Sequence, residues 1–298
     1  MATTVLACKP RGLPLARAVL SLFKLRIGVL IMVTALVGLA VTPGARLGLA
    51  QVLVLALSVL VASGSAGAFN HYAEHESDRL MARTRGRPFA TGALPHHPLW
   101  LVPMALLLLA AVGAAWALLN GPAALYVFLG AFFYGVVYTL WLKRRTPWNI
   151  VIGGLAGSFA VLAGAAAADP VPGPQAWLLA LVLFLWTPPH FWSLAIANRS
   201  EYLAAGIPML PVVVGDVRAA RIVFASTVAL VLASLLPLAV GAGWIYGVGA
   251  LGGGGWFVKQ TWRLARRPSR LNAMGAFFAS LIQLSALLAA ATADAFLR

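Results

Sequence analysis

Charged side chains are scarce in this sequence of 298 residues, since Asp, Glu, Lys and Arg together make up only 10% of it. A soluble domain carries about 25% charged residues. Acids are the rarest, with 7 Asp and Glu against 22 Lys and Arg, while hydrophobic residues reach 61% and the mean hydropathy is +0.90. This composition excludes an ordinary soluble domain and predicts an integral membrane protein.

Cysteine is nearly absent as well. The single cysteine, Cys8, excludes an intramolecular disulfide framework, and no metal-binding pattern accompanies it. The first residues also lack the apolar core and small-residue cleavage site of a secretory signal, and they hold few Arg and Ser for a transit peptide. We therefore expect residues 1–24 to form a cytoplasmic N-terminal arm with an amphipathic segment over residues 15–23.

Long apolar runs organise the rest of the chain. Roughly 20 apolar residues cross the ~30 Å hydrocarbon core of a bilayer. The apolar stretch at residues 244–258 is the weakest candidate span, because it contains four consecutive glycines, Gly252 to Gly255, and glycine disfavours a helix. We predict an all-α polytopic membrane protein, with one transmembrane domain over residues 25–298 whose roughly nine helices surround a central cavity. The nine stretches cover approximately residues 25–41, 49–70, 98–119, 123–142, 148–168, 175–196, 221–240, 244–258 and 273–295.

Positive charge is distributed unevenly between the connecting loops. If the N-terminus is cytoplasmic, all Lys and Arg except Arg46 and Arg298 fall on the cytoplasmic side. The positive-inside rule predicts such a split, and an odd number of helices then places the C-terminus outside. The net charge of +15 is thus explained by topology and by contact with anionic lipid of the bilayer, so nucleic acid is not expected as a partner.

The few acids are concentrated in two expected cytoplasmic loops, at about residues 70–97 and 197–220. Glu201 lies in the second loop, and the first contains three acids within five positions. If the second helix continues into this loop, Asn70, Glu74 and Asp78 share one helical face, with about 6 Å between successive members. Glu76 points away from that face.

Two carboxylates and an amide oxygen in a row suit Mg²⁺, which completes its coordination with water and phosphate oxygens. Arginines follow at positions 79, 83, 85 and 87, as a metal-bound diphosphate would require. A plainer interpretation is that the acids pair with these arginines in a solvated loop. The spacing alone leaves both interpretations open.

The stretch "NHYAEHESDRLMARTRGRP", residues 70–88, resembles the first aspartate-rich motif of the intramembrane prenyltransferases. Its ending, "DRLMARTRGRP", is similar to their heme O synthase branch. Three further stretches agree with that branch, in the same order, and together they span most of the chain. They are "FKLRI" at 23–27, "YTLWLKRRTPWNIVIGGLAG" at 138–157 and "TPPHFWSLAIANRSEYLAAGIPMLPVV" at 187–213.

The resemblance implies a Mg²⁺-dependent transfer of the farnesyl group of farnesyl diphosphate to a vinyl group of heme B, at the cytoplasmic side of a bacterial inner membrane. It implies that Asn70, Glu74 and Asp78 bind Mg²⁺ and, through it, the diphosphate. Glu201 would serve a second metal or the same polar cap. It also implies heme A synthase as a candidate partner. The cations expected to face the diphosphate are Lys24, Arg26, Arg83, Arg87, Lys143 and Arg144.

Aromatic and histidine side chains complete the expected site. Tyr138 and Trp192 are candidates for substrate binding, because aromatic ring faces stabilise a cation, although Tyr and Trp also collect at membrane interfaces. Three further aromatics, Tyr72, Tyr134 and Trp141, share this reasoning. His190 lies inside the sixth span, where ionisable groups are costly, and both contact with substrate or heme and structural packing remain open.

The sequence departs from the family pattern at several positions. Glu74 and Glu76 stand where the family usually has Asp, and Leu25 stands where it has Pro. These departures leave an aromatic quinone precursor open as the acceptor. A zinc site at His71, Glu74 and His75 is disfavoured because the loop is rich in arginine. A transporter or a decayed, non-catalytic relative is the alternative outside the enzyme class.

Overall fold

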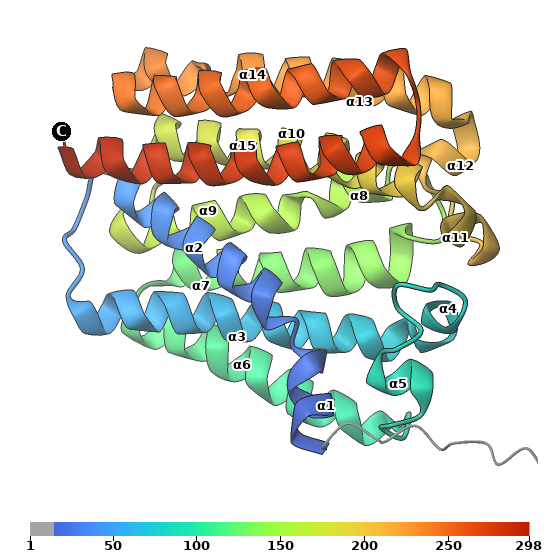
Figure 1. Ribbon diagram of the computed structural model, residues 1–298. Helices are drawn as coiled ribbons and strands as arrows, with labels where there is room; N and C mark the ends of the chain where they lie inside the picture. The colour runs from blue at the N-terminus through green and yellow to red at the C-terminus, as the bar shows by residue number, and fades with distance from the viewer. Residues whose placement is uncertain (1–14, 298) are drawn as a thin grey trace, which may run out of the picture.

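The computed structural model describes residues 15–297, which form helices and loops without any strand. Long helices lie side by side along a common axis (Figure 1). They are α2 Leu25–Val41, α3 Leu49–Ala73, α6 Leu101–Leu118, α7 Gly121–Phe132 with its continuation η2 Phe133–Leu142, α9 Leu155–Ala168, α10 Pro174–Ala197, α13 Asp216–Ala233, α14 Trp244–Arg266 and α15 Arg270–Leu297. Shorter helices connect them: α1 Leu15–Leu22, α4 His75–Arg79, α5 Pro88–Thr91, η1 Pro98–Trp100, α8 Asn149–Gly153, α11 Arg199–Ala204, α12 Leu210–Val214 and η3 Leu236–Val240.

The predicted all-α membrane fold is confirmed. Eight helical stretches of the described chain are long and apolar enough to cross a membrane. Helix α14 has 23 residues but is not among the eight, because glycines and basic residues lower its hydropathy. The count of nine spans and the orientation of the termini stay predictions.

Helix α14 is continuous through the four glycines that were expected to weaken it. Two of them face neighbouring helices at close range. A Cβ on Gly253 would lie 3.0 Å from Cα of Gln283 in α15, and one on Gly254 would lie 2.9 Å from the side chain of Val231 in α13. Close helix packing of this kind, which small residues permit in membranes, outweighs the low helix propensity of glycine.

Most of the predicted N-terminal arm, including Cys8, lies outside the described residues. Its last part forms α1, whose Ala18 and Leu22 are buried against α3 and α5. Lys24 then joins α1 to α2 in the left-handed backbone conformation, with φ 48° and ψ 44°. Only a few per cent of residues other than glycine adopt positive φ, so surrounding contacts must hold this turn.

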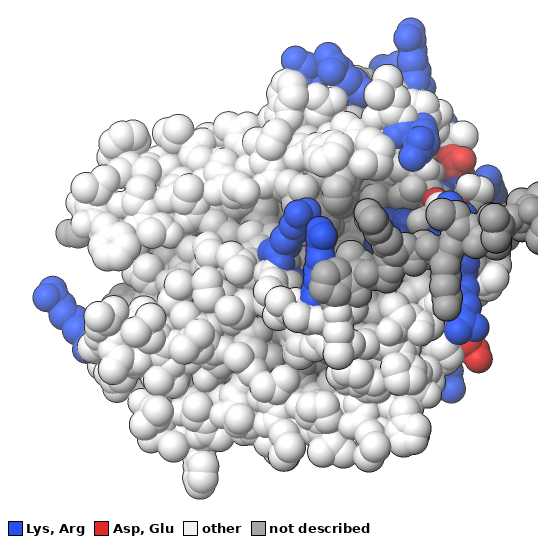
Figure 2. Space-filling model, turned by 60° about the horizontal axis from the view of Figure 1, so that its bottom comes forward, with Lys and Arg blue, Asp and Glu red and all other residues white. Residues whose placement is uncertain are grey.

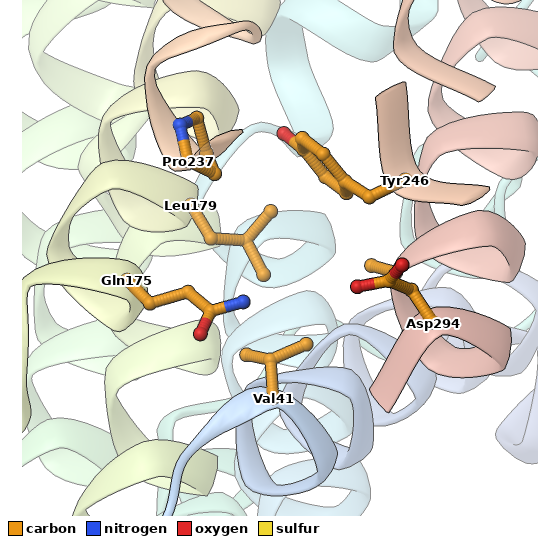
Figure 3. Close-up of a pocket in the computed structure, with 7 residues that line it drawn as sticks. Val41, Gln175, Leu179, Pro237, Tyr246 and Asp294 are labelled. Carbon is orange, nitrogen blue, oxygen red and sulfur yellow. The ribbon is translucent and has the colours of Figure 1, made fainter. Parts of the chain in front are cut away.

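Helices α9 and α10 form the centre of the bundle, and about 72% of the α10 span is buried. A small cavity of about 10 Å³ lies between the C-terminal ends of α2 and α15 and the N-terminal end of α10. Gln175, Tyr246 and Asp294 contribute polar groups to it (Figure 3). It is remote from the polar loops that carry most of the acids. The expected central cavity stays a prediction.

Charge is gathered at one end of the bundle. Figure 2 shows most Lys and Arg side chains toward the right-hand end, a further group near the middle of the face and few at the opposite end. Figure 1 places α4, α5, α11 and the α14–α15 connection at that same end. The two predicted acidic loops therefore lie together, as the charge count indicated.

Candidate active site

The kink between α3 and α4 brings the predicted acidic face together. Helix α3 ends at Ala73, and Glu74 leaves helical geometry with φ −101° and ψ 6°. The turn nevertheless continues, because the backbone N–H of Asp78 donates to the carbonyl of Glu74 at 2.8 Å. Asn70, Glu74 and Asp78 are only 2%, 4% and 2% exposed, whereas Glu76 faces solvent. Glu74 and Asp78 are therefore not solvated, which contradicts that part of the plainer interpretation. The pairing of an acid with an arginine, which it also predicted, is present between Asp78 and Arg87.

Both buried carboxylates are paired with cations from other parts of the chain. Lys143, at the end of η2, donates to Oε1 of Glu74 at 2.6 Å. Arg87, just before α5, donates to both oxygens of Asp78 at 2.9 and 2.7 Å. Its Nη1 also lies 3.9 Å from Oε2 of Glu74. Such charge-assisted contacts fix both carboxylates in place.

The amide at the head of this row has a cation of its own. Lys24 donates to Oδ1 of Asn70 at 2.5 Å and to the hydroxyl of Tyr134 at 3.0 Å. The left-handed turn at Lys24 directs the chain from α1 into α2 at the point where this contact is made. Each member of the acidic face thus has at least one basic partner, and Glu74 has two.

A π-helix supplies the opposite wall of the site. In η2 the backbone N–H of Lys143 bonds to the carbonyl of Tyr138, five residues earlier, at 2.9 Å. The wider turn aligns Tyr134 with Thr139, whose hydroxyl donates to the Tyr134 carbonyl at 2.8 Å and accepts from Nδ2 of Asn70 at 3.0 Å. π-Helical turns occur frequently at functional sites. Sequence reasoning missed Thr139, and no motif marks it.

Two tyrosine rings lie beside the cations. The rings of Tyr134 and Tyr138 stack with centroids 5.8 Å apart. The ammonium of Lys24 lies 5.6 Å from the centroid of Tyr134, and that of Lys143 lies 5.7 Å from Tyr138. Aromatic faces and cations therefore meet in one half-buried cluster beside the acidic face.

Three predicted basic residues remain outside this cluster. The side chains of Arg26, Arg83 and Arg144 are exposed, and none of the ion pairs between described residues involves them. Because these three arginines are exposed, they can attract an anion from a distance but do not contact the acidic face.

Glu201, in α11, is half-buried, and its Oε2 is buried without a hydrogen-bond partner. Among residues 15–297, no three His, Cys, Asp or Glu side chains come close enough together to hold a metal ion. Glu201 therefore does not join Glu74 and Asp78 in a single three-carboxylate site. His75 stacks on His96, with ring centroids 3.7 Å apart.

His190 and Trp192 lie deeper, on α10. The His190 ring is sandwiched between Trp186 and Phe277, at 4.1 and 4.6 Å between centroids, and its Nδ1 lies 2.6 Å from the hydroxyl of Ser280 in α15. Trp192 is 2% exposed, and its indole N–H has no hydrogen-bond partner in the described chain. His190 is thus packed against α15, and Trp192 presents an unused donor.

Residues 31–282 match the UbiA prenyltransferase family. The chain belongs to this family. It is similar to protoheme IX farnesyltransferase 2 of Paramagnetospirillum magneticum, with 58% identity over 91% of this chain and 94% of that protein. Protoheme IX farnesyltransferase 1 of the same organism is 45% identical, over 93% and 98% of the two chains. The enzyme of Alkalilimnicola ehrlichii is 40% identical, over 93% and 92%.

Solved structures share the UbiA fold at lower sequence identity. A digeranylgeranylglyceryl phosphate synthase aligns with a TM-score of 0.79 and 17% identity, over 95% of this chain and 99% of that one. A UbiA homolog from Archaeoglobus fulgidus, bound to DMAPP and Mg²⁺, aligns with a TM-score of 0.70 and 16% identity, over 94% and 100%. This UbiA-family chain is therefore a multi-pass membrane protein with the common fold of the family.

Proposed function

We propose that this UbiA-family chain transfers the farnesyl group of farnesyl diphosphate to a vinyl group of heme B, which forms heme O, at the cytoplasmic rim of a bacterial inner membrane. The names of its relatives support the reaction, since proteins 40–58% identical over nearly its whole length are protoheme IX farnesyltransferases. The fold supports the donor class, since a neighbour of the same fold binds DMAPP and Mg²⁺.

One observation carries the proposal: a buried row of oxygen ligands in which every member contacts a cation. The row is Asn70, Glu74 and Asp78, with Lys24, Lys143 and Arg87 as partners. Burying charge is costly without compensation. This site places three cations beside two carboxylates. It therefore suits a ligand that carries both kinds of charge, namely a metal cation bound to a diphosphate.

The donor set fits Mg²⁺. Carboxylate and amide oxygens are its preferred protein ligands, and it leaves coordination positions for water and phosphate. Glu201 also fits, because its buried Oε2 lacks any partner and is available to a second ion or to the same polar cap. When bound, Mg²⁺ supplies charge that stabilises the leaving diphosphate. The carboxylates of Glu74 and Asp78 would hold the ion, and Asn70 would serve as a neutral ligand.

The basic residues have the main role toward the donor. Lys24, Lys143 and Arg87 lie beside the acidic row and would bind diphosphate oxygens directly, whereas the row itself would contact the diphosphate through the metal ion. Their fixed charges stabilise the negative charge that develops on diphosphate as the allylic C–O bond breaks. Arg26, Arg83 and Arg144, on the exposed rim, attract the anionic donor from solution.

The resulting farnesyl cation must reach the acceptor before it meets water. The stacked rings of Tyr134 and Tyr138 lie beside the cluster, and ring faces stabilise a carbocation. The vinyl carbon of heme B attacks the cation to form the new C–C bond. Water then adds to the adjacent carbon and loses a proton, which gives the hydroxyethylfarnesyl side chain.

The acceptor belongs among the helices below the cluster. No atom lies within 4 Å of a Cβ built on Gly157 in α9, so space remains beside this residue. Trp192 offers an indole donor without a partner, and His190 is the ionisable side chain at that depth. A transporter would place its polar groups near the midplane, whereas here they are gathered at one end. Docking of heme A synthase to receive the product remains part of the proposal.

The test is direct. Purified protein supplied with Mg²⁺, farnesyl diphosphate and heme B should form heme O, detected by mass spectrometry. If heme B stays unchanged while an aromatic quinone precursor is prenylated, the acceptor in the proposal is wrong and the prenyl transfer stands. If neither acceptor reacts under any metal condition, the enzyme assignment itself is wrong.

A further inference from the structure

A basic and aromatic groove lies at the junction of α14 and α15, apart from the acidic cluster. Its lining residues are Trp262, Arg263, Arg266, Arg267 and Asn272. Its volume is about 380 Å³, within the ~300–1,000 Å³ range of small-molecule sites. The proposed reaction makes no use of any of these side chains.

No carboxylate neutralises the groove. The sequence contains no Asp or Glu between Asp216 and Asp294, although Lys259, Arg263, Arg266, Arg267 and Arg270 all fall in that interval. None of the ion pairs between described residues involves these five cations. An external anion is therefore the natural counter-charge.

The groove is held in shape by its own contacts. The guanidinium of Arg266 lies over the ring of Trp262, 4.4 Å from its centroid, and Trp262 packs on Phe224 of α13 at 5.2 Å. Asn272 ties the connection between the two helices, because its Nδ2 donates to the carbonyl of Arg267 at 2.7 Å. A guanidinium fixed on an aromatic ring keeps its N–H groups available for phosphate oxygens.

The face of α14 that leads into the membrane from this groove is apolar and smooth. Val248, Leu251 and Trp256 are exposed there. Between them, Gly252 and Gly255 are exposed as well, and a Cβ on either would meet no atom within 4 Å. The same helix thus offers room for a hydrocarbon chain over Gly252 and Gly255 and, at its C-terminal end, the cations of the groove.

We propose that this groove binds the phosphate of an anionic phospholipid of the cytoplasmic leaflet, with one acyl chain lying along the outer face of α14 over Gly252 and Gly255. The cytoplasmic leaflet carries negative surface potential that attracts clustered Lys and Arg. Trp262 and Trp256 lie where aromatic side chains anchor a helix at the interface. The proposal does not depend on the reaction assigned to the acidic cluster.

The experiment measures lipid retention. The full chain is reconstituted in nanodiscs of phosphatidylglycerol and phosphatidylcholine, released gently, and examined by native mass spectrometry. Wild type should retain phosphatidylglycerol at least tenfold more than phosphatidylcholine. The double variant Arg263→Gln/Arg266→Gln should lose this preference, and excess soluble glycerol phosphate should not displace the lipid, because the acyl chain adds to the binding.

The matched control is Arg17→Gln/Arg85→Gln, which removes two exposed arginines that do not line the groove. It should retain lipid like wild type. Equal retention of both lipids by wild type, or equal loss in both double variants, would show that only diffuse charge acts and would overturn the proposal. Displacement by glycerol phosphate alone would assign the groove to a soluble anion, and binding of an acidic peptide in place of lipid would assign it to a protein; both results reject a lipid site. Circular dichroism and gel filtration check that each variant is folded.

Discussion

Nζ of Lys143 lies 2.6 Å from Oε1 of Glu74, and this contact joins the end of the π-helix η2 to the kink between α3 and α4. The two residues are 69 positions apart in the sequence. Both side chains are largely buried, with relative exposures of 12% and 5%. The pair therefore joins two walls of the proposed diphosphate site.

Glu74 stands where the family pattern has Asp. The effect of its longer side chain can therefore be tested by substitution. Glu74→Asp keeps the charge but withdraws the carboxylate from Lys143 by one methylene group. We expect activity within about tenfold of wild type, with a higher Mg²⁺ concentration needed for half-maximal rate. Glu74→Gln should lose at least about 100-fold in kcat, as typically follows removal of one group that stabilises charge. Equal Mg²⁺ curves for wild type and Glu74→Asp would argue against a metal ligand here.

Asp78→Asn tests the other carboxylate. Asn has the same shape, but it removes the negative charge beside Arg87. Activity should fall by at least about 100-fold in farnesyl transfer assays. Because Asp78 is buried, the variant should also lose about 1–3 kcal/mol of unfolding free energy through the weakened pairing of Arg87. Glu76→Gln is the control, since this exposed acid lies two residues away; a comparable loss there would contradict the assignment of Asp78.

Lys24 and Arg26 are close in sequence but differ in placement, which makes them a matched pair. Lys24 contacts Asn70 and Tyr134, whereas Arg26 is exposed. Lys24→Gln should raise KM for farnesyl diphosphate by about tenfold or more, because a buried charged hydrogen bond to the substrate is lost. Arg26→Gln should change KM by less than about threefold at 0.15 M salt, since exposed charges are screened. Steady-state kinetics at two salt concentrations separate these outcomes.

The sequence predicted part of this site for a clear physical reason. Asn70, Glu74 and Asp78 share a face because helical periodicity is local, and the kink at Glu74 does not destroy it. The basic partners could not be selected in the same way. Lys24 and Arg26, or Lys143 and Arg144, are equivalent in charge, and only tertiary packing decides which of each pair turns inward.

Backbone irregularities account for most of what the sequence left open. The left-handed turn at Lys24 and the π-helical turn that aligns Thr139 with Asn70 have no motif in the sequence. The burial of Asp78 was left open as well, because the charge and spacing of this loop fit both a solvated loop and a metal-binding face. Contacts between segments distant in the sequence determine each of these features, so local sequence patterns do not predict them.

Thr139 gives a way to test the π-helix. Thr139→Val has nearly the same volume but removes the hydroxyl that joins Tyr134 to Asn70. The Nδ2 of Asn70 is then buried without an acceptor, which should cost about 1–3 kcal/mol of stability. Activity should fall as Asn70 loses its fixed orientation. Thr139→Ser, which restores the hydroxyl, should recover most of both properties; failure of Ser to rescue would mean that side-chain shape rather than the hydrogen bond matters.

The glycines of α9 test how closely the central helices approach each other. A Cβ on Gly164 would lie 1.7 Å from the carbonyl oxygen of Ala35 in α2, so Gly164→Ala must push two helices apart. Overpacking of a tight interior costs about 1–3 kcal/mol, and here the obstacle is backbone that cannot rotate away. The unfolding temperature in detergent should fall clearly. Gly157→Ala, seven residues earlier on the same helix, meets open space and should leave that temperature unchanged or slightly raised, because alanine favours a helix. If Gly157→Ala nevertheless lowers the rate with heme B while stability is kept, the open space beside Gly157 is used by the acceptor.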